Sequence, residues 1–321
     1  MAVVGFYNLE NLYDTINDPL KNDEEFLPES LRLYNSSVYW DKLNRLSTVI
    51  SMMGKEMSPD GLALVGVAEI ENDTVLADLV KQPELKDRSL KFVHYNSPDI
   101  RGVDVGLLYN PKYFRVLNSA PLFVKLPGGS KASYFTRDIL YVKGILLGDT
   151  IHVFVNHWPS RVGGEERSIP ARAAAAMVCK IKIDSLSAID PATKIIVMGD
   201  LNDDPISPSV TEVLKAKGKA EDVQSPELFN PWVSMYKKGI GTLAYQDSWG
   251  LFDQIILSSG WLNKEQKGFA YYKASIFNNE FMVQKTGRYK GYAKRTWDGT
   301  TYNYGYSDHF PTYITLLKKI Q

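Results

Sequence analysis

The chain has 321 residues, of which 44% are hydrophobic and 23% are charged, a composition typical of a globular protein with a large core. Its 37 basic and 37 acidic residues cancel, which excludes a protein that holds nucleic acid through its net charge, although a local basic patch is still allowed. The single cysteine, Cys179, excludes an internal disulfide framework and a zinc site made of several cysteines.

The apolar stretches are no longer than a strand, so the sequence predicts no membrane span. Residues 1–4 lead straight into an apolar run without a secretory signal, which fits a cytoplasmic protein or the mature form of an exported one. No repeat, low-complexity segment or internal linker is apparent, and no obligate protein partner is evident. We therefore expect one domain over residues 1–321.

Short apolar runs predict strands, and two segments have the pattern of a helix. The expected strands are residues 2–7, 62–68, 103–109, 139–147, 151–155, 195–199, 251–258 and 313–317, with 139–155 forming a hairpin that turns at Gly148. The first helix has apolar residues at steps of three and four and would end at Gly54. Its predicted buried face consists of Trp40, Leu43, Leu46, Val49, Ile50 and Met53.

The second predicted helix is the alanine-rich segment 171–186, with Pro170 in its first turn. Helices and hairpins occur together, which argues against a purely parallel sheet. We therefore predict an α/β fold in which two mixed, mainly antiparallel sheets pack face to face with helices outside, a four-layer α-β-β-α sandwich.

Side chains that can bind a metal or move a proton lie at the ends of most predicted strands. In layered α/β proteins, catalytic groups gather on the loops at one edge of the sheets. Taken singly, each has an ordinary explanation as a turn, a cap or a buried histidine, but their repetition favours a functional site. The candidates are Asn8, Glu69, Asp104, His157, Asp200, Asn202, Asp253, Asp308 and His309.

The chemistry that these residues favour is attack on a phosphorus ester with the help of a divalent metal. Carboxylate and amide oxygens are preferred ligands of Mg²⁺ and Ca²⁺, whereas the histidines lack the spacing of a zinc site. A histidine held by a carboxylate can act as acid or base near neutral pH. The absence of a Gly-x-x-x-x-Gly-Lys loop argues against hydrolysis of nucleoside triphosphates.

Short motifs that run in order along nearly the whole chain are individually weak and jointly specific. They are Asn8-Leu-Glu-Asn11, Ala68-Glu-Ile-Glu-Asn72, Arg101-Gly-Val-Asp-Val-Gly-Leu-Leu-Tyr109, Asn156-His-Trp-Pro-Ser-Arg161, Gly199-Asp-Leu-Asn-Asp203, Asp253-Gln-Ile255 and Ser307-Asp-His309. This order resembles the endonuclease/exonuclease/phosphatase superfamily, which has the deoxyribonuclease-I-like fold.

The resemblance implies a metal site and a position for the attacking water. Glu69 would be the principal metal ligand, with Asn8 beside it and Asp308 on the same side. Asp200 and Asn202 would hold the attacking water and the phosphate, and Asp200 could also touch a second metal. The expected cofactor is Mg²⁺, with Mn²⁺ or Ca²⁺ as alternatives, and the number of metals stays open.

The resemblance also implies two histidines on opposite sides of the scissile phosphate. His309, paired with Asp253, would be the general base or the imidazole that binds the phosphate. His157, oriented by Asp104, would help to protonate the leaving oxygen. Which histidine is acid and which is base stays open. Arg137 resembles the phosphate-contacting arginine of the family.

The superfamily acts on DNA, RNA, phosphoinositides, sphingomyelin and small molecules, so the fold does not fix the substrate. Residues 285–306 combine basic and aromatic side chains, which favours a nuclease; they could instead pack on the sheet edge. These side chains are Lys285, Arg288, Lys290, Lys294 and Arg295 with Tyr289, Tyr292, Trp297, Tyr302, Tyr304 and Tyr306.

Two alternatives stay beside the nuclease. One is a phosphatase or phosphodiesterase acting on phosphoinositide, sphingomyelin or small phosphorylated metabolites, and the other is a binding protein that has lost the chemistry. Residues 14–29 are strongly acidic, and we expect them to form a solvated loop away from the site. The aromatic residues 230–249 would either cover the cleft or pack against the core.

Overall fold

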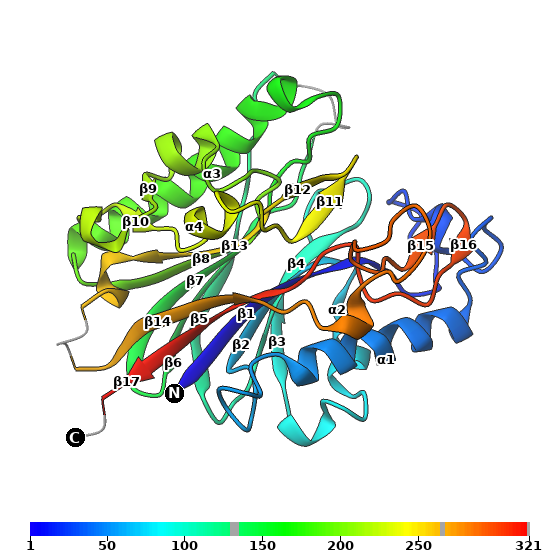
Figure 1. Cartoon of the computed structure of the whole chain (residues 1–321), viewed down its shortest axis with the longest axis horizontal. Helices are drawn as coiled ribbons and strands as arrows, with labels where there is room; N and C mark the ends of the chain where they lie inside the picture. The colour runs from blue at the N-terminus through cyan, green and yellow to red at the C-terminus, as the bar shows by residue number, and fades with distance from the viewer. Residues whose placement is uncertain (129–134, 264–266, 320–321) are drawn as a thin grey trace.

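Two mixed β-sheets pack face to face in the computed structural model of the chain, which describes residues 1–128, 135–263 and 267–319 (Figure 1). The first sheet has the spatial order β14 (Phe269–Ile276), β17 (Thr312–Lys318), β1 (Ala2–Leu12), β2 (Leu64–Ile70), β4 (Asp104–Tyr109) and β3 (Lys91–His94). The second has the order β5 (Phe114–Leu122), β6 (Ile139–Leu146), β7 (Asp149–His157), β8 (Lys194–Asp200), β13 (Asp253–Ser258), β10 (Leu228–Phe229) and β9 (Ala216–Lys217).

Two small hairpins extend beyond the sheets at the ends of the strands. One joins β11 (Leu243–Tyr245) to β12 (Ser248–Gly250), and the other joins β15 (Trp297–Asp298) to β16 (Thr301–Tyr302). Short helical turns lie at Glu24–Phe26, Lys86–Arg88, Ser209–Val213, Ala220–Asp222, Ser259–Trp261 and Glu280–Met282.

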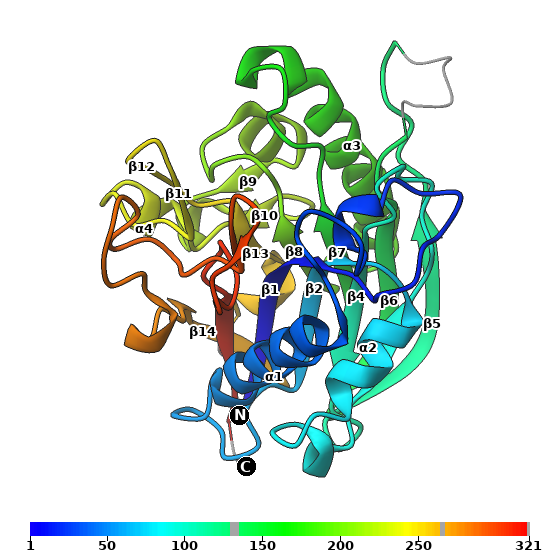
Figure 2. The same cartoon turned by 90° about the vertical axis from the view of Figure 1, so that its right-hand side faces the viewer.

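Helices form the outer layers. In Figure 2, α1 (Ser36–Met52) and α2 (Asp73–Val80) lie outside the first sheet, and α3 (Glu165–Ile189) lies outside the second. A short helix, α4 (Val233–Tyr236), follows β10. The layers are helix, sheet, sheet and helix, so the predicted four-layer sandwich is confirmed. Within the described ranges, no helix combines the length and the apolar composition that crossing a bilayer needs.

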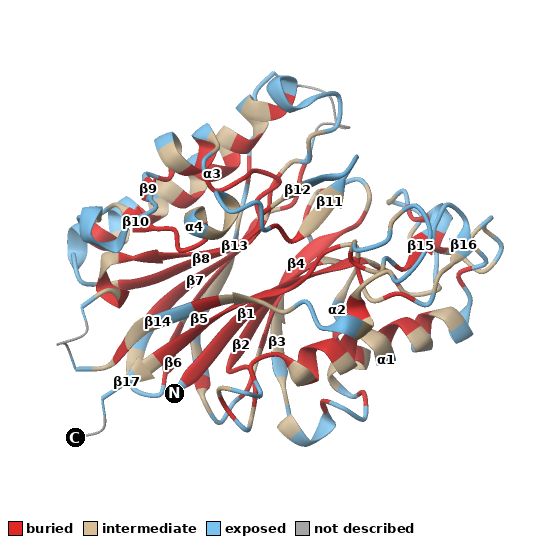
Figure 3. Cartoon of the chain, viewed as in Figure 1, coloured by how far each residue is buried: buried red, intermediate tan, exposed pale blue. Residues whose placement is uncertain are grey.

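The central strands are hydrophobic on both faces. In β1, Val4 and Phe6 pack between the two sheets, whereas Val3 and Tyr7 pack beneath the helices of the outer layer. Successive side chains of a strand point to opposite faces, so a strand covered on both sides is apolar throughout. This burial, which Figure 3 shows in red along the strands, explains why the sequence reads as short continuous apolar runs.

Both predicted helices exist, and the alanine-rich helix begins earlier than predicted. The first begins at Ser36 because the side chain of Asn35 accepts hydrogen bonds from the backbone N–H groups of Ser37 and Val38. Trp40, predicted on the buried face, is 48% exposed. The alanine-rich helix begins at Glu165, so Pro170 lies inside the helix and not in its first turn.

Strand register brings three candidate residues into one row. β7 and β8 are parallel, and His157 lies opposite Asp200. β13 runs antiparallel to β8, and Asp253 lies opposite Asp200 on the other side. In the first sheet, β1 and β2 are parallel and Asn8 lies opposite Ala68. The strand ends that carry the candidates therefore share one edge, and both chain termini lie at the opposite edge (Figure 1).

Candidate active site

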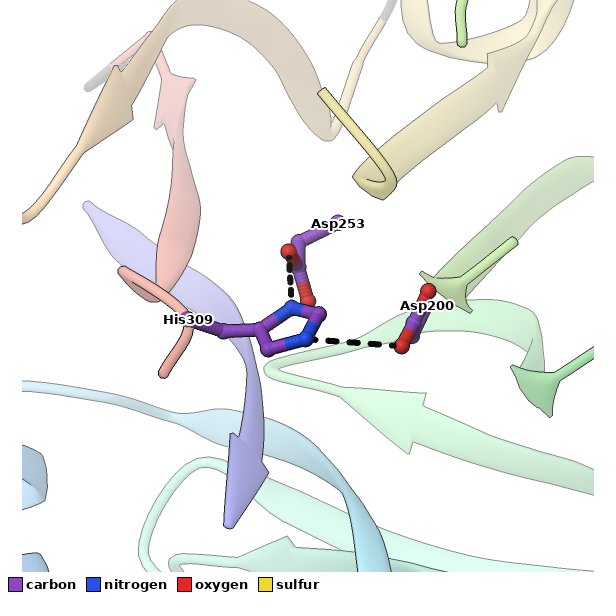
Figure 4. Close-up of side chains that lie close together, drawn as sticks. All are labelled: Asp200, Asp253 and His309. Carbon is purple, nitrogen blue, oxygen red and sulfur yellow. Dashed lines mark hydrogen bonds and ion pairs between the residues drawn. The ribbon is translucent and has the colours of Figure 1, made fainter. Parts of the chain in front are cut away.

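A carboxylate–imidazole cluster lies where the two sheets meet (Figure 4). Asp200, Asp253 and His309 each offer a ligand atom, and these atoms all lie within 4.8 Å of one another. His309 Nδ1 donates a hydrogen bond to Asp253 Oδ2 over 2.8 Å, and its Nε2 lies 3.9 Å from Asp200 Oδ2. Asp253 therefore holds the ring so that Nε2 faces Asp200.

A second imidazole approaches the same carboxylate from the other side. His157 Nε2 lies 3.7 Å from Asp200 Oδ2 and 3.7 Å from Glu69 Oε1. One oxygen of Asp200 thus lies between two imidazole nitrogens that come from different sheets. Among the described residues, His157 Nδ1 has no hydrogen-bond partner.

The predicted metal-side residues surround this cluster without being part of its tightest group. Asn8 Nδ2 donates to Asp200 Oδ2 over 3.0 Å, and Asn11 N donates to Glu69 Oε2 over 2.9 Å. Asp308 Oδ1 lies 3.9 Å from His309 Nε2. The available donors are mainly carboxylate and amide oxygens, which fit Mg²⁺, Mn²⁺ or Ca²⁺ better than zinc.

The backbone is left-handed at several site residues, although none of them is glycine. The φ angles are 48° at Glu10, 55° at Asn11, 60° at Glu69 and 49° at Asn202. Such conformations cost free energy, cluster at functional sites and persist where the surrounding structure holds them. Lys42 of α1, which is fully buried, holds the first pair by donating to the carbonyl oxygens of Glu10 and Asn11.

The environments of the two imidazoles displace their pKa values in opposite directions. Burial, with the nearby Arg137, lowers the pKa of His157 well below its ordinary value. Burial would also lower the pKa of His309, but Asp253 and then Asp200 outweigh it and raise that pKa well above the ordinary value. Burial raises the pKa of the Asp200 carboxyl to about 6. The free protein thus presents a charged and a neutral imidazole on either side of one carboxylate.

A titration of the imidazole C–H resonances by NMR, with metal removed, should show this separation. At pH 7 we expect His309 to be protonated and His157 and His152 to be neutral, since burial lowers the pKa of His152 to about 4. The proton on His309 stabilises the fold at acid pH, and this contribution is lost as the pH rises through its raised pKa. His157 affects stability in the opposite direction. Its lowered pKa means that the unfolded chain binds the proton first, so the folded state loses stability as the pH falls below about 6.5. Titration of both rings near that value would contradict the assignment.

Asp104 does not contact His157 in the way that the resemblance implies. Its Oδ2 lies 3.1 Å from His94 Nε2, and its Oδ1 accepts a hydrogen bond from Ser97 N over 2.9 Å. The other nitrogen of His94 lies 2.7 Å from Asp73 Oδ1. Asp104 is thus engaged by the neighbouring strand β3, which the sequence analysis did not predict.

Arg137 is buried close to the site, but its donors are in use. Its Nε and Nη2 donate to the carbonyl oxygens of His157 and Trp158, and its Nη1 donates to Asp99 Oδ2. Only 6% of the residue is exposed. Each of its three nitrogens makes one hydrogen bond to the chain, and in this conformation Arg137 braces the backbone that carries His157.

Asn202 is tied to the loop that follows β8. Its backbone N–H donates to Asp200 Oδ1 over 2.9 Å, and its Nδ2 donates to Trp158 O over 2.9 Å. Gly199 directly precedes Asp200. A Cβ at this position would lie 2.3 Å from Asn156 O, so β7 and β8 approach each other too closely for a residue other than glycine. The motif Gly199-Asp-Leu-Asn therefore fixes the direction of the Asp200 carboxylate.

Some residues that support the site were not identified from the sequence. Thr242 Oγ1 donates to Asp253 Oδ2 over 2.5 Å, and Thr296 N donates to Glu10 Oε2 over 2.6 Å. Lys42 gave one weak signal, a charged residue directly before Leu43 on the buried face of its helix. The others lie in loops whose position depends on the tertiary fold.

The acidic segment 14–29 was expected to form a solvated loop away from the site, and its first residue contacts Glu71, two residues after Glu69. It continues directly from β1, and Asp14 N donates to Glu71 Oε2 over 2.7 Å. With Asp18 and Asp104, these acids line a cavity of about 310 Å³ at the edge that carries the site. The segment is held there by Lys21 Nζ, which donates to the carbonyl oxygens of residues 97 and 99.

The aromatic residues of segment 285–306 divide into two groups. Trp297 is buried in the core beneath the outer helices, with Tyr302 packed against it. Arg45 of α1 lies over the rings of Tyr304 and Tyr306, at 5.5 and 5.7 Å. These side chains attach the segment to the first helix, as in the packing alternative considered from the sequence.

The remaining aromatic residues form a continuous run toward the site. Trp249 stacks on Phe310, the residue that follows the histidine of Figure 4, with centroids 6.1 Å apart and an interplanar angle of 11°. Tyr292 lies next to Trp249 and Tyr289 lies next to Tyr292. Trp232, from the same predicted loop as Trp249, is instead fully buried between the sheets.

Comparison with known proteins places this geometry in context. A model of the endonuclease/exonuclease/phosphatase family matches residues 3–318. No curated protein matches the sequence. A solved structure of a family protein from Bacteroides thetaiotaomicron is similar, with 15% identity, a TM-score of 0.60 and coverage of 100% of this chain and 98% of that chain.

Two further similar structures are of proteins with a named activity or ligand. A mannosyl-6-phosphatase of B. thetaiotaomicron has 15% identity and a TM-score of 0.58 over 99% of this chain and 100% of its own. D. rerio TDP2, complexed with single strand DNA product, has 13% identity and a TM-score of 0.58 over 99% of each chain. At these identities the likeness demonstrates a shared fold.

Proposed function

Because the chain belongs to the endonuclease/exonuclease/phosphatase family, we propose that it is a divalent-metal-dependent phosphoesterase. The observation that carries this proposal is the position of Asp200 Oδ2, 3.7 Å from His157 Nε2 and 3.9 Å from His309 Nε2. Two imidazoles with oppositely displaced pKa values around one carboxylate can divide the roles of proton donor and acceptor.

In this proposal the chain supplies oxygen donors for a divalent ion. Glu69, Asn8 and Asp308 would hold Mg²⁺, with Mn²⁺ or Ca²⁺ as alternatives, because these ions prefer carboxylate and amide oxygens. When bound, such an ion neutralises the negative charge that grows on a phosphoryl oxygen.

The protein side chains then divide the proton transfers. Above its pKa of about 6, the Asp200 carboxylate accepts a hydrogen bond from the attacking water and orients it for in-line attack. The attacking water passes its proton to the Asp200 carboxylate as its oxygen bonds to phosphorus, and protonated His309, held by Asp253, donates its proton to the leaving oxygen as the bond from that oxygen to phosphorus breaks. Neutral His157 offers a second acceptor across the phosphate, and Asn202 fixes the loop on which Asp200 lies.

We propose a nuclease as the most specific activity. The run of rings from Tyr289 through Tyr292 and Trp249 to Phe310 leads to the site, and aromatic faces stack on nucleic acid bases. Exposed basic residues of the same segment, such as Lys285, add charge for phosphates. The similarity to D. rerio TDP2, solved with single strand DNA product, agrees with this activity.

A specific observation favours the alternative, a phosphatase or phosphodiesterase acting on small phosphate esters or lipid head groups. The cavity lined by Asp14, Asp18, Glu71 and Asp104 would repel further phosphates of a polyanion, whereas carboxylates readily accept hydrogen bonds from hydroxyl groups. The similar mannosyl-6-phosphatase has a substrate of this general kind.

A substrate panel separates the two activities. Purified protein would be incubated with Mg²⁺, Mn²⁺ or Ca²⁺ and with plasmid DNA, single strands, RNA, inositol phosphates, sphingomyelin or sugar phosphates. The Glu69→Ala variant should lose about 10²- to 10⁴-fold of the rate on whichever substrate is cleaved, because a carboxylate proposed to hold the ion, 3.7 Å from His157 Nε2, is removed.

Plasmid nicking that the variant lacks would support the nuclease, and release of inorganic phosphate without nicking would support the alternative. EDTA should abolish either activity, and excess Mg²⁺ should restore it. Hydrolysis at equal rates by the wild-type protein and the Glu69→Ala variant would contradict the proposed function.

A further inference from the structure

Arg295 is a cation at the mouth of the site that the roles assigned so far do not use. Its Nη2 lies 3.4 Å from Asp308 Oδ2, and its Nε lies 3.6 Å from Glu10 Oε1. Its side chain is 46% exposed, so part of the guanidinium faces solvent. Asp308 in turn lies 3.9 Å from the Nε2 of His309, which places the guanidinium one side chain away from the reacting imidazole.

Three other basic side chains around the site, unlike the partly exposed Arg101, have their nitrogens hydrogen-bonded by the protein. Arg137 donates from each of its three nitrogens to acceptors of the chain and is 6% exposed. Lys42 is fully buried against two backbone carbonyls. Arg161 contacts Asp203, Glu165 and the carbonyl oxygen of Asn202. Arg295 is more exposed than these three side chains, and its contacts to carboxylates, at 3.4 and 3.6 Å, are longer than most of theirs.

The backbone that carries Arg295 is braced on both sides. Thr296 N donates to the buried Glu10 Oε2 over 2.6 Å, and Asn303 Nδ2 donates to Arg295 O over 3.1 Å. A Cβ at Gly305 would lie 1.9 Å from Arg295 O, so the loop segment around Gly305 packs directly against the backbone of Arg295. The guanidinium is thus presented from a rigid support, as an arginine that orients an anion requires.

The site also needs a positive charge there. The carboxylates of Glu10, Asp200, Asp253 and Asp308 repel an approaching phosphate, and a fixed guanidinium close to two of them offsets this repulsion. A guanidinium stays charged at all working pH values and can bind two phosphate oxygens with parallel N–H groups.

We propose that Arg295 is a substrate-binding residue that contacts the non-bridging oxygens of the substrate phosphate, with Glu10 and Asp308 holding its guanidinium in place. The inference rests on the proposed phosphoesterase function and gives it a phosphate-recognition residue. The same contacts also fit a role in which Arg295 only positions Asp308. The experiment separates the two roles.

The experiment compares Arg295→Ala and Arg295→Lys with the wild-type protein. The substrates are p-nitrophenyl phosphate and bis(p-nitrophenyl) phosphate in Mg²⁺, and binding of inorganic phosphate is measured separately by calorimetry. Loss of a charge-assisted hydrogen-bonded contact should raise KM and the Kd of phosphate about 10- to 100-fold, with kcat changed by less than about threefold. Lysine, which keeps the charge but not the fork, should give an intermediate value.

The matched control is Arg115→Ala, since Arg115 is an exposed arginine near the start of β5, at the sheet edge opposite to the site. It should leave KM, kcat and phosphate binding unchanged, and both Arg295 variants should keep the unfolding temperature of the wild type.

Unchanged KM and phosphate affinity in Arg295→Ala would overturn the proposal. A raised Mg²⁺ requirement with unchanged KM would also overturn it, because Arg295 would then act only through Asp308. These outcomes differ from failure of the phosphoesterase proposal, in which the wild-type protein itself would hydrolyse no substrate better than Glu69→Ala. Phosphate binding tests Arg295 even in that case.

Discussion

The His309→Ala substitution should lower the rate of phosphoester hydrolysis about 10²- to 10⁴-fold, measured at a temperature at which the variant is still folded. His309 is the imidazole that Asp253 holds at 2.8 Å and that faces Asp200, so its removal takes away the proton donor and leaves the strands intact. The measurement is kcat/KM on the substrate that the panel identifies, beside a thermal unfolding curve.

The Asp253→Asn substitution tests the pair and not the ring alone. Asparagine keeps an oxygen for His309 Nδ1 but removes the charge, so the pKa of His309 should fall toward its ordinary value. Activity should decrease less than in His309→Ala, and the pH profile should shift to lower pH on its alkaline side. The matched control is His152→Gln, because His152 lies near the start of β7 and hydrogen-bonds Tyr141. Activity near wild type in His309→Ala would eliminate His309 as the proton donor.

The Asp203→Ala substitution should destabilise the fold by about 3–5 kcal/mol, the usual cost of removing one partner of a buried ion pair. Arg172 of α3 is fully buried and its Nε lies 2.7 Å from Asp203 Oδ1, so the variant leaves an unpaired charge in the interior. Ser209 Oγ also donates to Asp203 Oδ2 over 2.5 Å. Urea unfolding measures the difference in free energy.

A double variant tests whether the unpaired buried charge causes the loss of stability, and a surface variant serves as the control. Replacing both partners, in Asp203→Leu with Arg172→Met, should recover part of the lost stability, because no buried charge is then unpaired. Asp222→Ala removes an exposed carboxylate and should change the unfolding free energy by less than about 0.5 kcal/mol. If Asp203→Ala were as mild as this control, the ion pair with Arg172 would contribute nothing to stability.

The fold could be predicted from the apolar strands, and the candidate site residues could be predicted from their positions at the ends of those strands. The central strands are covered on both faces, so they appear as apolar runs, and their registers bring His157, Asp200 and Asp253 into one row. Edge elements such as β3 and β14 were not predicted, because they are only partly buried and lack such a run. The start of the alanine-rich helix was placed too late, because its first turn from Glu165 is polar and lacks a side-chain cap.

Contacts between side chains were less predictable than their positions. The implied pair of Asp104 and His157 is absent because His94, on an unpredicted edge strand, takes the Asp104 carboxylate. The donors of Arg137 are used by carbonyl oxygens of the adjacent strand end, which only the folded arrangement reveals. Sequence motifs thus located the candidates, whereas hydrogen-bond partners depended on the packing of loops.

The buried ammonium of Lys42 couples the outer helix to the catalytic edge. It reaches the carbonyl oxygens of Glu10 and Asn11 only while α1 is docked on β1, so the left-handed turn behind Asn8 loses its support whenever that helix detaches. Subglobal opening of α1 would therefore abolish the proposed activity while the paired sheets remain assembled. Loss of this activity on heating should then precede the collapse of the β-sandwich, and the helix layer would set the upper temperature of the proposed activity.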